Sequence, residues 1–231
     1  MKFNKGILFI FSIILTSCTT SNNNEAFIKK ASGNYLYNSD EIIEVYFIEK
    51  ELYLKWRGAE NIKPLKVDDG IFYVKEMNEK IQFLTNPSNQ QYHIVLVPKE
   101  KGKTVEYNYR KLTINEHIPS EYLKNNDYKK ALEGYLAIKE KDSLDGAINE
   151  KDLNSLGYKA LRDQNFEYAI NIFKINVALY PGSSNVYDSL GEAFMKNGDT
   201  IPAIENYKKS LELDSGNKRA KEQIKKLENK N

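Results

Sequence analysis

Near its carboxyl end, the chain repeats a pattern of small and apolar residues after 34 positions. The two copies are Leu153, Leu156, Gly157, Ala169, Phe173 and Pro181, followed by Tyr187, Leu190, Gly191, Ala203, Tyr207 and Ser215. A unit of this length is a pair of helices that cannot bury its apolar face alone, so neighbouring units stack on one another. The repeat therefore predicts a helical solenoid, with a groove that can receive a partner.

The repeated pattern resembles the tetratricopeptide repeat, because an aromatic residue or leucine, Leu-Gly, Ala, an aromatic residue and Pro occur in that order. The resemblance implies that the first helix of each pair lines the concave face of the solenoid. The matching positions are Lys151, Asn154, Tyr158, Arg162, Asn185, Asp188, Glu192 and Lys196. This mixture of amide, aromatic and charged side chains suits an extended peptide; ordinary exposed helix residues are the alternative. The Lys, Asn and Arg set that holds a terminal carboxylate in chaperone-binding relatives is not reproduced.

The two clear repeats span residues 150–215, and a degenerate first repeat with a linker is expected over residues 114–149. In this degenerate repeat, Ala131 takes the small-residue position and Tyr135 the aromatic position. The helix before them is expected to be weak, because Pro119 lies inside it and proline ends or kinks a helix.

Two glycines occupy matched positions inside the predicted helices. Gly157 and Gly191 each cost on the order of 1 kcal/mol relative to Ala, which indicates that two helices approach closely there. Asn165 is expected to cap the second helix of the first clear repeat. Residues 216–231 are predicted to form a capping helix with a polar outer side. Its apolar face is made of Ala220, Ile224 and Leu227.

The first 17 residues have the pattern of a signal peptide, with Lys2 and Lys5 ahead of an apolar stretch that is short for a membrane span. Leu15-Thr16-Ser17-Cys18 resembles a bacterial lipobox, and Cys18 is the only cysteine. The resemblance implies lipidation of Cys18, with residues 18–25 as the lipidated Cys and a polar tether. An ordinary secretory signal with a nearby cysteine is the alternative. The expected location is the cell envelope, at the outer membrane.

The charge of the chain gives no reason to expect nucleic acid as a partner. Lys2 and Lys5 account for the net charge of +2, so that the rest of the chain has equal numbers of acidic and basic residues. A balanced surface does not concentrate phosphate groups.

Residues 26–113 show the alternation of β-strands. Ile43, Val45 and Phe47 alternate with polar residues, and Leu52, Leu54 and Trp56 do so after a Glu49-Lys50-Glu51 turn, which predicts a hairpin. Further strands are expected at 71–75, 81–84, 92–97 and 105–109. The chain is thus predicted to be an α+β protein of two domains. An antiparallel β sandwich or partial barrel is followed by an α-helical tetratricopeptide-repeat solenoid.

The β region also resembles an uncharacterised domain of Bacteroidota proteins that often follows β-lactamase-like serine hydrolase domains. The motifs that carry the resemblance are Gly33-Asn34-Tyr35, Glu51-Leu52-Tyr53-Leu54, Pro64-Leu65, Ile71-Phe72 and Ile81-Gln82-Phe83. The resemblance implies one alternative function, as the accessory subunit of a separately encoded serine hydrolase.

A catalytic set is not evident in the sequence. His93 and His117 have no cysteine or second histidine at ligand spacing, so both are interpreted as partly exposed structural residues and no metal is expected. Ser215-Gly216-Asn217-Lys218 has the letters of a Ser-x-x-Lys motif but lies in a turn after a repeat. Gly102-Lys103-Thr104 lacks the glycine that a phosphate loop needs five residues earlier, and Asp68-Asp69 before a glycine indicates a turn.

These patterns together predict a non-catalytic, lipid-anchored envelope protein without a cofactor. Its helical repeats are expected to bind a protein or peptide partner. The chain has 16 tyrosines, many in the β region, and an aromatic lining for a small molecule or glycan is an alternative function of the sheet. Packing of these rings in the core explains them equally, because tyrosine favours strands.

Overall fold

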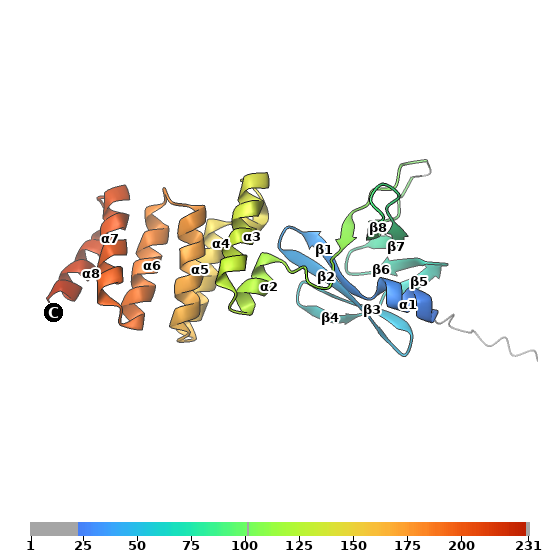
Figure 1. The fold of residues 1–231 in the computed structure, drawn as a ribbon, viewed down its shortest axis with the longest axis horizontal. Coiled ribbons are helices and arrows are strands. Elements are labelled where there is room, and N and C mark those ends of the chain that lie inside the picture. The colour runs from blue at the N-terminus through green and yellow to red at the C-terminus, as the bar shows by residue number, and fades with distance from the viewer. Residues whose placement is uncertain (1–22, 101, 230–231) are drawn as a thin grey trace, which may run out of the picture.

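The computed structural model describes residues 23–100 and 102–229, in which an antiparallel sheet is followed by a row of helices (Figure 1). The predicted signal peptide and the lipidation site Cys18 lie outside the described residues. The strands are β1 (Gly33–Asn38), β2 (Glu41–Ile48), β3 (Glu51–Trp56), β4 (Ala59–Ile62), β5 (Leu65–Asp68), β6 (Ile71–Val74), β7 (Glu79–Thr85), β8 (Tyr92–Leu96) and β9 (Tyr109–Lys111). The helices are α1 (Glu25–Ala31), α2 (Pro119–Lys124), α3 (Tyr128–Lys141), a 3₁₀ turn η1 (Gly146–Ile148), α4 (Glu150–Arg162), α5 (Phe166–Leu179), α6 (Ser184–Asn197), α7 (Thr200–Leu213) and α8 (Lys218–Glu228).

The strands form one curled sheet in the order β4-β3-β2-β1-β9-β8-β7-β6-β5. The partial barrel is therefore the form adopted, rather than a sandwich of two sheets. The predicted hairpin is confirmed, with Val45 opposite Leu54. Its turn is made by Glu49 and Lys50, both with positive φ, which is the twist that a two-residue hairpin loop requires.

Helix α1 occupies a segment that the sequence pattern assigned to the tether and to β structure, so the prediction is wrong there. Asn24, expected in the tether, instead accepts a hydrogen bond from the amide of Phe27 at 2.8 Å and so caps the helix. The ring of Phe27 stacks on Phe72 at 6.0 Å and meets the edge of Phe83 at 5.4 Å. α1 thereby covers the core of the curled sheet.

The last strand also differs from the prediction. A strand was expected at 105–109, but only Tyr109 of that stretch lies in β9, which continues to Lys111. Before β9, the side chain of Asn108 accepts the amide hydrogen of Leu96 at 2.9 Å. A side-chain bond replaces the ladder there, so the strand begins late.

The helices pair as the 34-residue register predicts. α4 packs against α5, and α6 against α7, with α8 on the last pair. A Cβ atom at Gly157 would lie 2.5 Å from the ring of Phe173, and one at Gly191 would lie 3.0 Å from the ring of Tyr207. Both glycines are therefore required by the close approach of the paired helices. This is the approach that their unfavourable free energy inside a helix indicated. The cap expected at Asn165 is present. A helix also forms where the capping helix was predicted, and its Ala220 and Leu227 are buried.

The degenerate repeat keeps the expected core, since Ala131 and Tyr135 are buried. The prediction for Pro119 is wrong, because it begins α2 instead of ending a helix. A proline suits the first helical position, where the missing amide hydrogen has no partner to lose. Its ring packs against Gly134 of α3, where a Cβ would come within 2.7 Å.

The turn between β1 and β2 joins the sheet to the helices. The Asp40 carboxylate accepts the amide hydrogen of Ser120 at 2.7 Å and the hydroxyl of Tyr135 at 2.8 Å. Ser39 donates to Asp145 at 2.5 Å beside it. Because Ile118 offers no side-chain acceptor at the start of α2, Asp40 supplies the cap from the other domain.

Candidate partner-binding groove

The eight residues predicted for the groove lie on α4 and α6, the first helices of the two clear pairs. We call the surface formed by these eight residues the groove face. Each residue of α4 in the set has a counterpart 34 positions later in α6. We call residues separated by 34 positions a row of the groove face. Tyr158, Asp188 and Glu192 are half-buried, while Lys151, Arg162 and Lys196 are exposed.

The α4 part of the groove face is open. Among the residues that the structure describes, the side chains of Lys151 and Arg162 make no hydrogen bond or ion pair. The side-chain oxygen of Asn154 is buried and has no hydrogen-bond partner within the described chain. Two exposed cations without an acidic partner leave this part of the surface able to bind carbonyl and carboxylate groups.

Tyr158 connects the two helices of the groove face. Its hydroxyl donates to Glu192 at 3.2 Å and lies 3.3 Å from the hydroxyl of Ser189. Burial raises the pKa of Tyr158, and the nearby Glu192 carboxylate adds to the effect. The phenol therefore stays protonated and acts as a hydrogen-bond donor to the acid.

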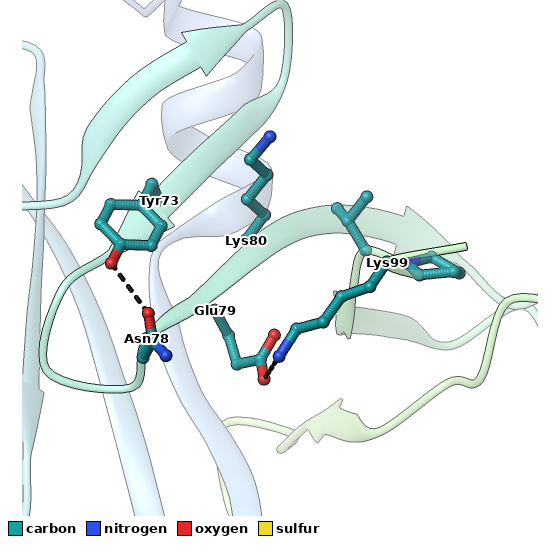
Figure 2. Close-up of a pocket in the computed structure, with 7 residues that line it drawn as sticks. Tyr73, Asn78, Glu79, Lys80 and Lys99 are labelled. Atoms are coloured by element: carbon teal, nitrogen blue, oxygen red, sulfur yellow. Dashed lines mark hydrogen bonds and ion pairs between the residues drawn. The ribbon is translucent and has the colours of Figure 1, made fainter. Parts of the chain in front are cut away.

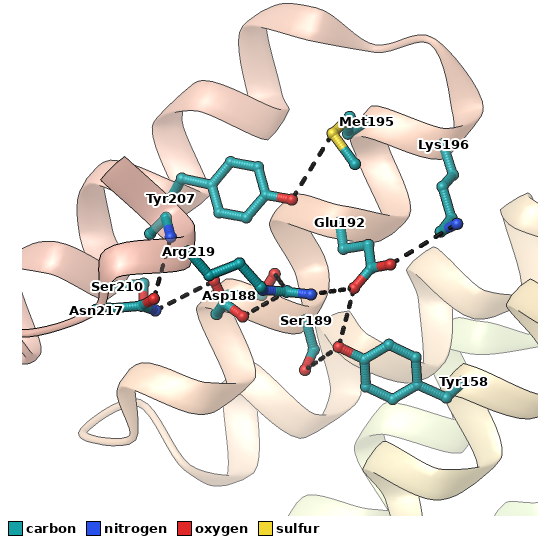
Figure 3. Close-up of polar contacts among 11 residues, drawn as sticks. Tyr158, Asp188, Ser189, Glu192, Met195, Lys196, Tyr207, Ser210, Asn217 and Arg219 are labelled. Carbon is teal, nitrogen blue, oxygen red and sulfur yellow. Dashed lines mark hydrogen bonds and ion pairs between the residues drawn. The ribbon is translucent and has the colours of Figure 1, made fainter. Parts of the chain in front are cut away.

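The two acids of α6 are paired with an arginine from α8. Arg219 donates to Glu192 at 2.5 Å and forms an ion pair with the Asp188 carboxylate (Figure 3). It also reaches the main-chain oxygen of Asp188 at 3.3 Å. Burial disfavours the charged guanidinium, but the bonds to Glu192 and Asp188 outweigh it, so the pKa of Arg219 is raised.

Arg219 was not predicted as a groove residue. It lies 34 positions after Asn185 and 68 after Lys151, so it belongs to the same row of the groove face. The repeat register, continued one step past residue 215, would have identified it. Asn185 itself donates to Glu150 at 3.1 Å, which links α6 to the start of α4.

The residues weighed for catalysis do not form a reactive group. Ser215 lies in the exposed turn before α8, where the amide of Gly216 bonds to Asp214 at 2.9 Å, and Lys218 is the exposed first residue of α8. Within residues 23–100 and 102–229, no three His, Cys, Asp or Glu side chains gather as metal ligands. The same residues contain no helix that is both long and apolar enough to cross a membrane.

The interpretation of the histidines holds for one of them. His117 is exposed and lies 3.2 Å from Glu121. His93 was expected to be partly exposed but is only 5 % exposed, because Tyr107 packs over it with ring centroids 5.4 Å apart. Neither ring nitrogen has a hydrogen-bond partner in the described part of the chain. Burial lowers the pKa of His93, and the Arg110 charge lowers it further.

The aromatic residues of the sheet mostly pack on one another. Tyr35 is buried, and Tyr37 stacks on Tyr109 with centroids 5.1 Å apart. A pocket of about 340 Å³ lies elsewhere, beside β6 and β7 (Figure 2). Four of its polar residues are engaged in pairs, Tyr73 with Asn78 and Lys99 with Glu79, while Lys80 also lines it.

A second pocket of about 420 Å³ lies between β2, β3 and α2. Trp56 is part of its lining, and the indole nitrogen of Trp56 is buried without an acceptor among the described residues. The Arg57 guanidinium lies 4.8 Å from the centre of the Trp56 ring and bonds to Glu41 at 3.1 Å.

The sequence matches no family model and no curated protein. Among solved structures, the chain is similar to the first tetratricopeptide repeat domain of Spaghetti (RPAP3) bound to the HSP90 peptide SRMEEVD. The identity is 21 %, the match covers 48 % of this chain and 86 % of that one, and the TM-score is 0.35.

Two further solved structures resemble the chain to a similar degree. A point mutant of MamA is 19 % identical over 48 % of this chain and 79 % of that chain, with a TM-score of 0.39. The Sgt2 domain from Aspergillus fumigatus is 18 % identical over 48 % and 73 %, with a TM-score of 0.35. Similarity at this level does not bear on partner or activity. The helix pairs, their 34-residue register and the glycine–aromatic contacts themselves show that the helical part is a solenoid of the tetratricopeptide type.

Proposed function

We propose that the protein is a non-catalytic interaction module that binds a protein or peptide segment on its groove face. The observation that carries this proposal is the exposed part of the groove face on α4, in which the side chains of Lys151 and Arg162 make no hydrogen bond or ion pair with any other described residue. Both side chains are hydrogen-bond donors, and carbonyl or carboxylate oxygens of a bound segment would accept from them.

Site-specific photocrosslinking in cells tests this proposal. A photoreactive residue replaces Arg162 on the groove face, and in a matched control it replaces the exposed Glu167 of α5. The same partner protein is expected in crosslinks from position 162 and not from position 167. Equal crosslinking from both positions, or none from position 162, contradicts the proposal.

We also propose that the mature chain is anchored to the bacterial outer membrane through a lipid on Cys18. The lipobox-like Leu15-Thr16-Ser17-Cys18 and the absence of any other cysteine support this. One acyl group binds membranes only weakly, and stable anchoring needs more than one chain. Labelled palmitate should enter the wild-type protein and not Cys18→Ser, which should also leave the membrane fraction. Label in both proteins contradicts the anchor.

The second candidate function is binding of a glycan or small molecule by the sheet. It is favoured by the indole nitrogen of Trp56, which lacks an acceptor in the lining of the 420 Å³ pocket. A sugar that stacks on this ring could place a hydroxyl oxygen so that it accepts the indole N–H hydrogen. A screen of soluble glycans by thermal shift should find stabilisation that Trp56→Phe reduces, and an identical response in the variant excludes this pocket.

A further inference from the structure

The last helix of the chain places a cation on the groove face. Arg219, at the start of α8, contacts the Asp188 carboxylate, the Asp188 main-chain oxygen and the Glu192 carboxylate (Figure 3). It lies in the row of Lys151 and Asn185, so the repeat register places it beside the residues of the groove face. α8 therefore caps the stack and also supplies a cation to the acids of this face.

The acids that Arg219 holds are largely shielded from water. The side chains of Asp188 and Glu192 are 13 % and 16 % exposed, whereas that of Arg219 is 41 % exposed. A shielded carboxylate that loses its partner is costly, so this pair needs a cation at all times. Lys196 lies 3.7 Å from Glu192, too far to replace the hydrogen bond of Arg219.

The start of α8 depends on the same acid. Asn217 caps α8 through the amide of Ala220 at 3.0 Å and donates its amide group to Asp188 at 3.1 Å. It also reaches the hydroxyl of Ser210 at 3.0 Å. Displacement of Arg219 from Asp188 would therefore act on the first turn of α8, where the helix is joined to the groove.

The geometry points to α8 as an intramolecular competitor of the partner. We propose that a partner segment with an arginine or lysine side chain replaces Arg219 at Asp188 and Glu192. The chemistry follows from the contacts, because two carboxylates and a main-chain carbonyl converge there and only a cation with several donors satisfies all three. This proposal rests on the proposed function of the groove face and adds the charge of the partner and the contact that restrains its binding.

The competition sets how tightly the groove binds. A site that is open for only a fraction of the time has its apparent affinity reduced by that fraction. Removal of Arg219 should therefore strengthen the binding of a basic segment about tenfold, since an intramolecular charge pair of this kind favours the closed state by about that factor.

The test is an NMR titration of the full chain with a synthetic peptide in which a single arginine is flanked by glycine and serine. Arg219→Gln should bind it about tenfold more tightly than the wild type. The triple variant Arg219→Gln, Asp188→Asn, Glu192→Gln should lose this gain, and so should a peptide with glutamine in place of arginine. Equal affinity of wild type and Arg219→Gln overturns the proposal.

Two controls keep the result specific. Glu228→Gln removes the 3.3 Å ion pair between Lys208 and Glu228, which also ties α8 to α7 but leaves Arg219 in place. It should bind the peptide like the wild type, and a tenfold gain in this variant contradicts a role for Arg219. If Arg219→Gln unfolds α8, Arg219→Lys keeps the charge but has a single nitrogen to share between the two carboxylates, so it should give a smaller gain.

The outcome also separates this inference from the function on which it rests. Crosslinking from position 162 tests the groove at α4, away from Arg219. Crosslinks that persist while the peptide shows no preference for Arg219→Gln leave the groove in place and refute only the competition. Absence of both refutes the groove itself.

Discussion

At the scale of single residues, Gly157 shows how little space separates the paired helices. A Cβ atom there would lie 2.5 Å from the Phe173 ring, which is fully buried and cannot turn away. Gly157→Ala is expected to lower the free energy of unfolding by about 1–2 kcal/mol, because overpacking outweighs the better helix propensity of alanine. At Gly191 the distance is 3.0 Å, so Gly191→Ala should cost less. Urea unfolding of both variants measures this, and a larger loss at position 191 contradicts it.

His93 makes stability depend on pH. Its pKa is lowered by burial and by Arg110 from an ordinary value of 6.5, so the unfolded chain binds the proton at higher pH than the folded chain. The contribution of the neutral ring is fully present above pH 6.5 and is lost as pH falls toward the lowered pKa. His93→Phe should therefore gain stability relative to the wild type as pH drops from 7 to 5. A difference between the two proteins that does not change with pH rules this out.

At the scale of elements, the turn between β1 and β2 acts on a helix of the other domain. Asp40 accepts hydrogen bonds from Ser120 and Tyr135, and its removal in Asp40→Ala leaves both donors without their partner. A loss of about 1–3 kcal/mol is expected, since the Ser120 amide at the start of α2 loses its cap and the hydroxyl of the buried Tyr135 loses its acceptor. Thermal unfolding followed by circular dichroism measures it. Ser39→Ala, which loses one bond beside it, should cost less.

The same carboxyl gives a second pH response, of opposite sign to that of His93. Burial raises the pKa of Asp40 above 3.8, against the lowering effect of the bonds from Ser120 and Tyr135. The folded chain therefore holds this proton more tightly, so stability falls as pH rises from 3.8 to the raised pKa. Asp40→Asn removes the charge and keeps an acceptor, and should flatten this part of the stability curve. An unchanged slope would show that Asp40 does not cause it.

The helices were predicted more fully than the strands, for a physical reason. Gly157 and Gly191 occupy the same position in the two repeats. They therefore predict the same close contact between helices in both helix pairs. α1 was not predicted, since seven residues are too few to give a periodic signal and the helix is stabilised by Phe27 against the sheet. The sequence predicts that Pro119 ends or kinks a helix. It instead begins α2, and the residue that caps this helix is Asp40, which is far away in the sequence.

The groove face was predicted only in part. The eight residues are fixed by the repeat register, but the charge pairing among them is set by a residue outside the two repeats. Arg219 forms ion pairs with both Asp188 and Glu192, and the sequences of α4 and α6 alone do not predict this pairing. Whether an exposed side chain is free or occupied depends on the neighbouring element, and periodicity does not contain that information.

At the scale of the whole molecule, the sheet domain takes the place of the missing half of a repeat. α2 has 6 residues, whereas the corresponding helices α4 and α6 have 13 and 14. Asp40 of the β1–β2 turn is bonded to Ser120 of α2 and to Tyr135 of α3. The sheet lies at the end of the helical row that begins with α2 (Figure 1). A solenoid needs a polar cap at each end, and here the sheet provides one and α8 the other.

This arrangement predicts that the solenoid depends on the sheet. The fragment of residues 114–231 loses the acceptor for Ser120 and Tyr135 and exposes the end of the stack. Its helices should melt at a lower temperature than those of the full chain, by more than Asp40→Ala alone lowers the melting temperature. Circular dichroism at the helical wavelength measures both, and equal melting of fragment and full chain contradicts the dependence.

The strand order has a consequence for how the chain folds. β1 to β4 and β5 to β8 are two runs of neighbouring strands that pair locally, and β9 alone joins them, with Tyr35 opposite Lys111. Pairing β9 with β1 closes a loop that contains all the strands between them. This costs more entropy than forming a hairpin and is therefore slower. Both runs can form early when the chain folds, but the sheet is completed only when β9 pairs with β1.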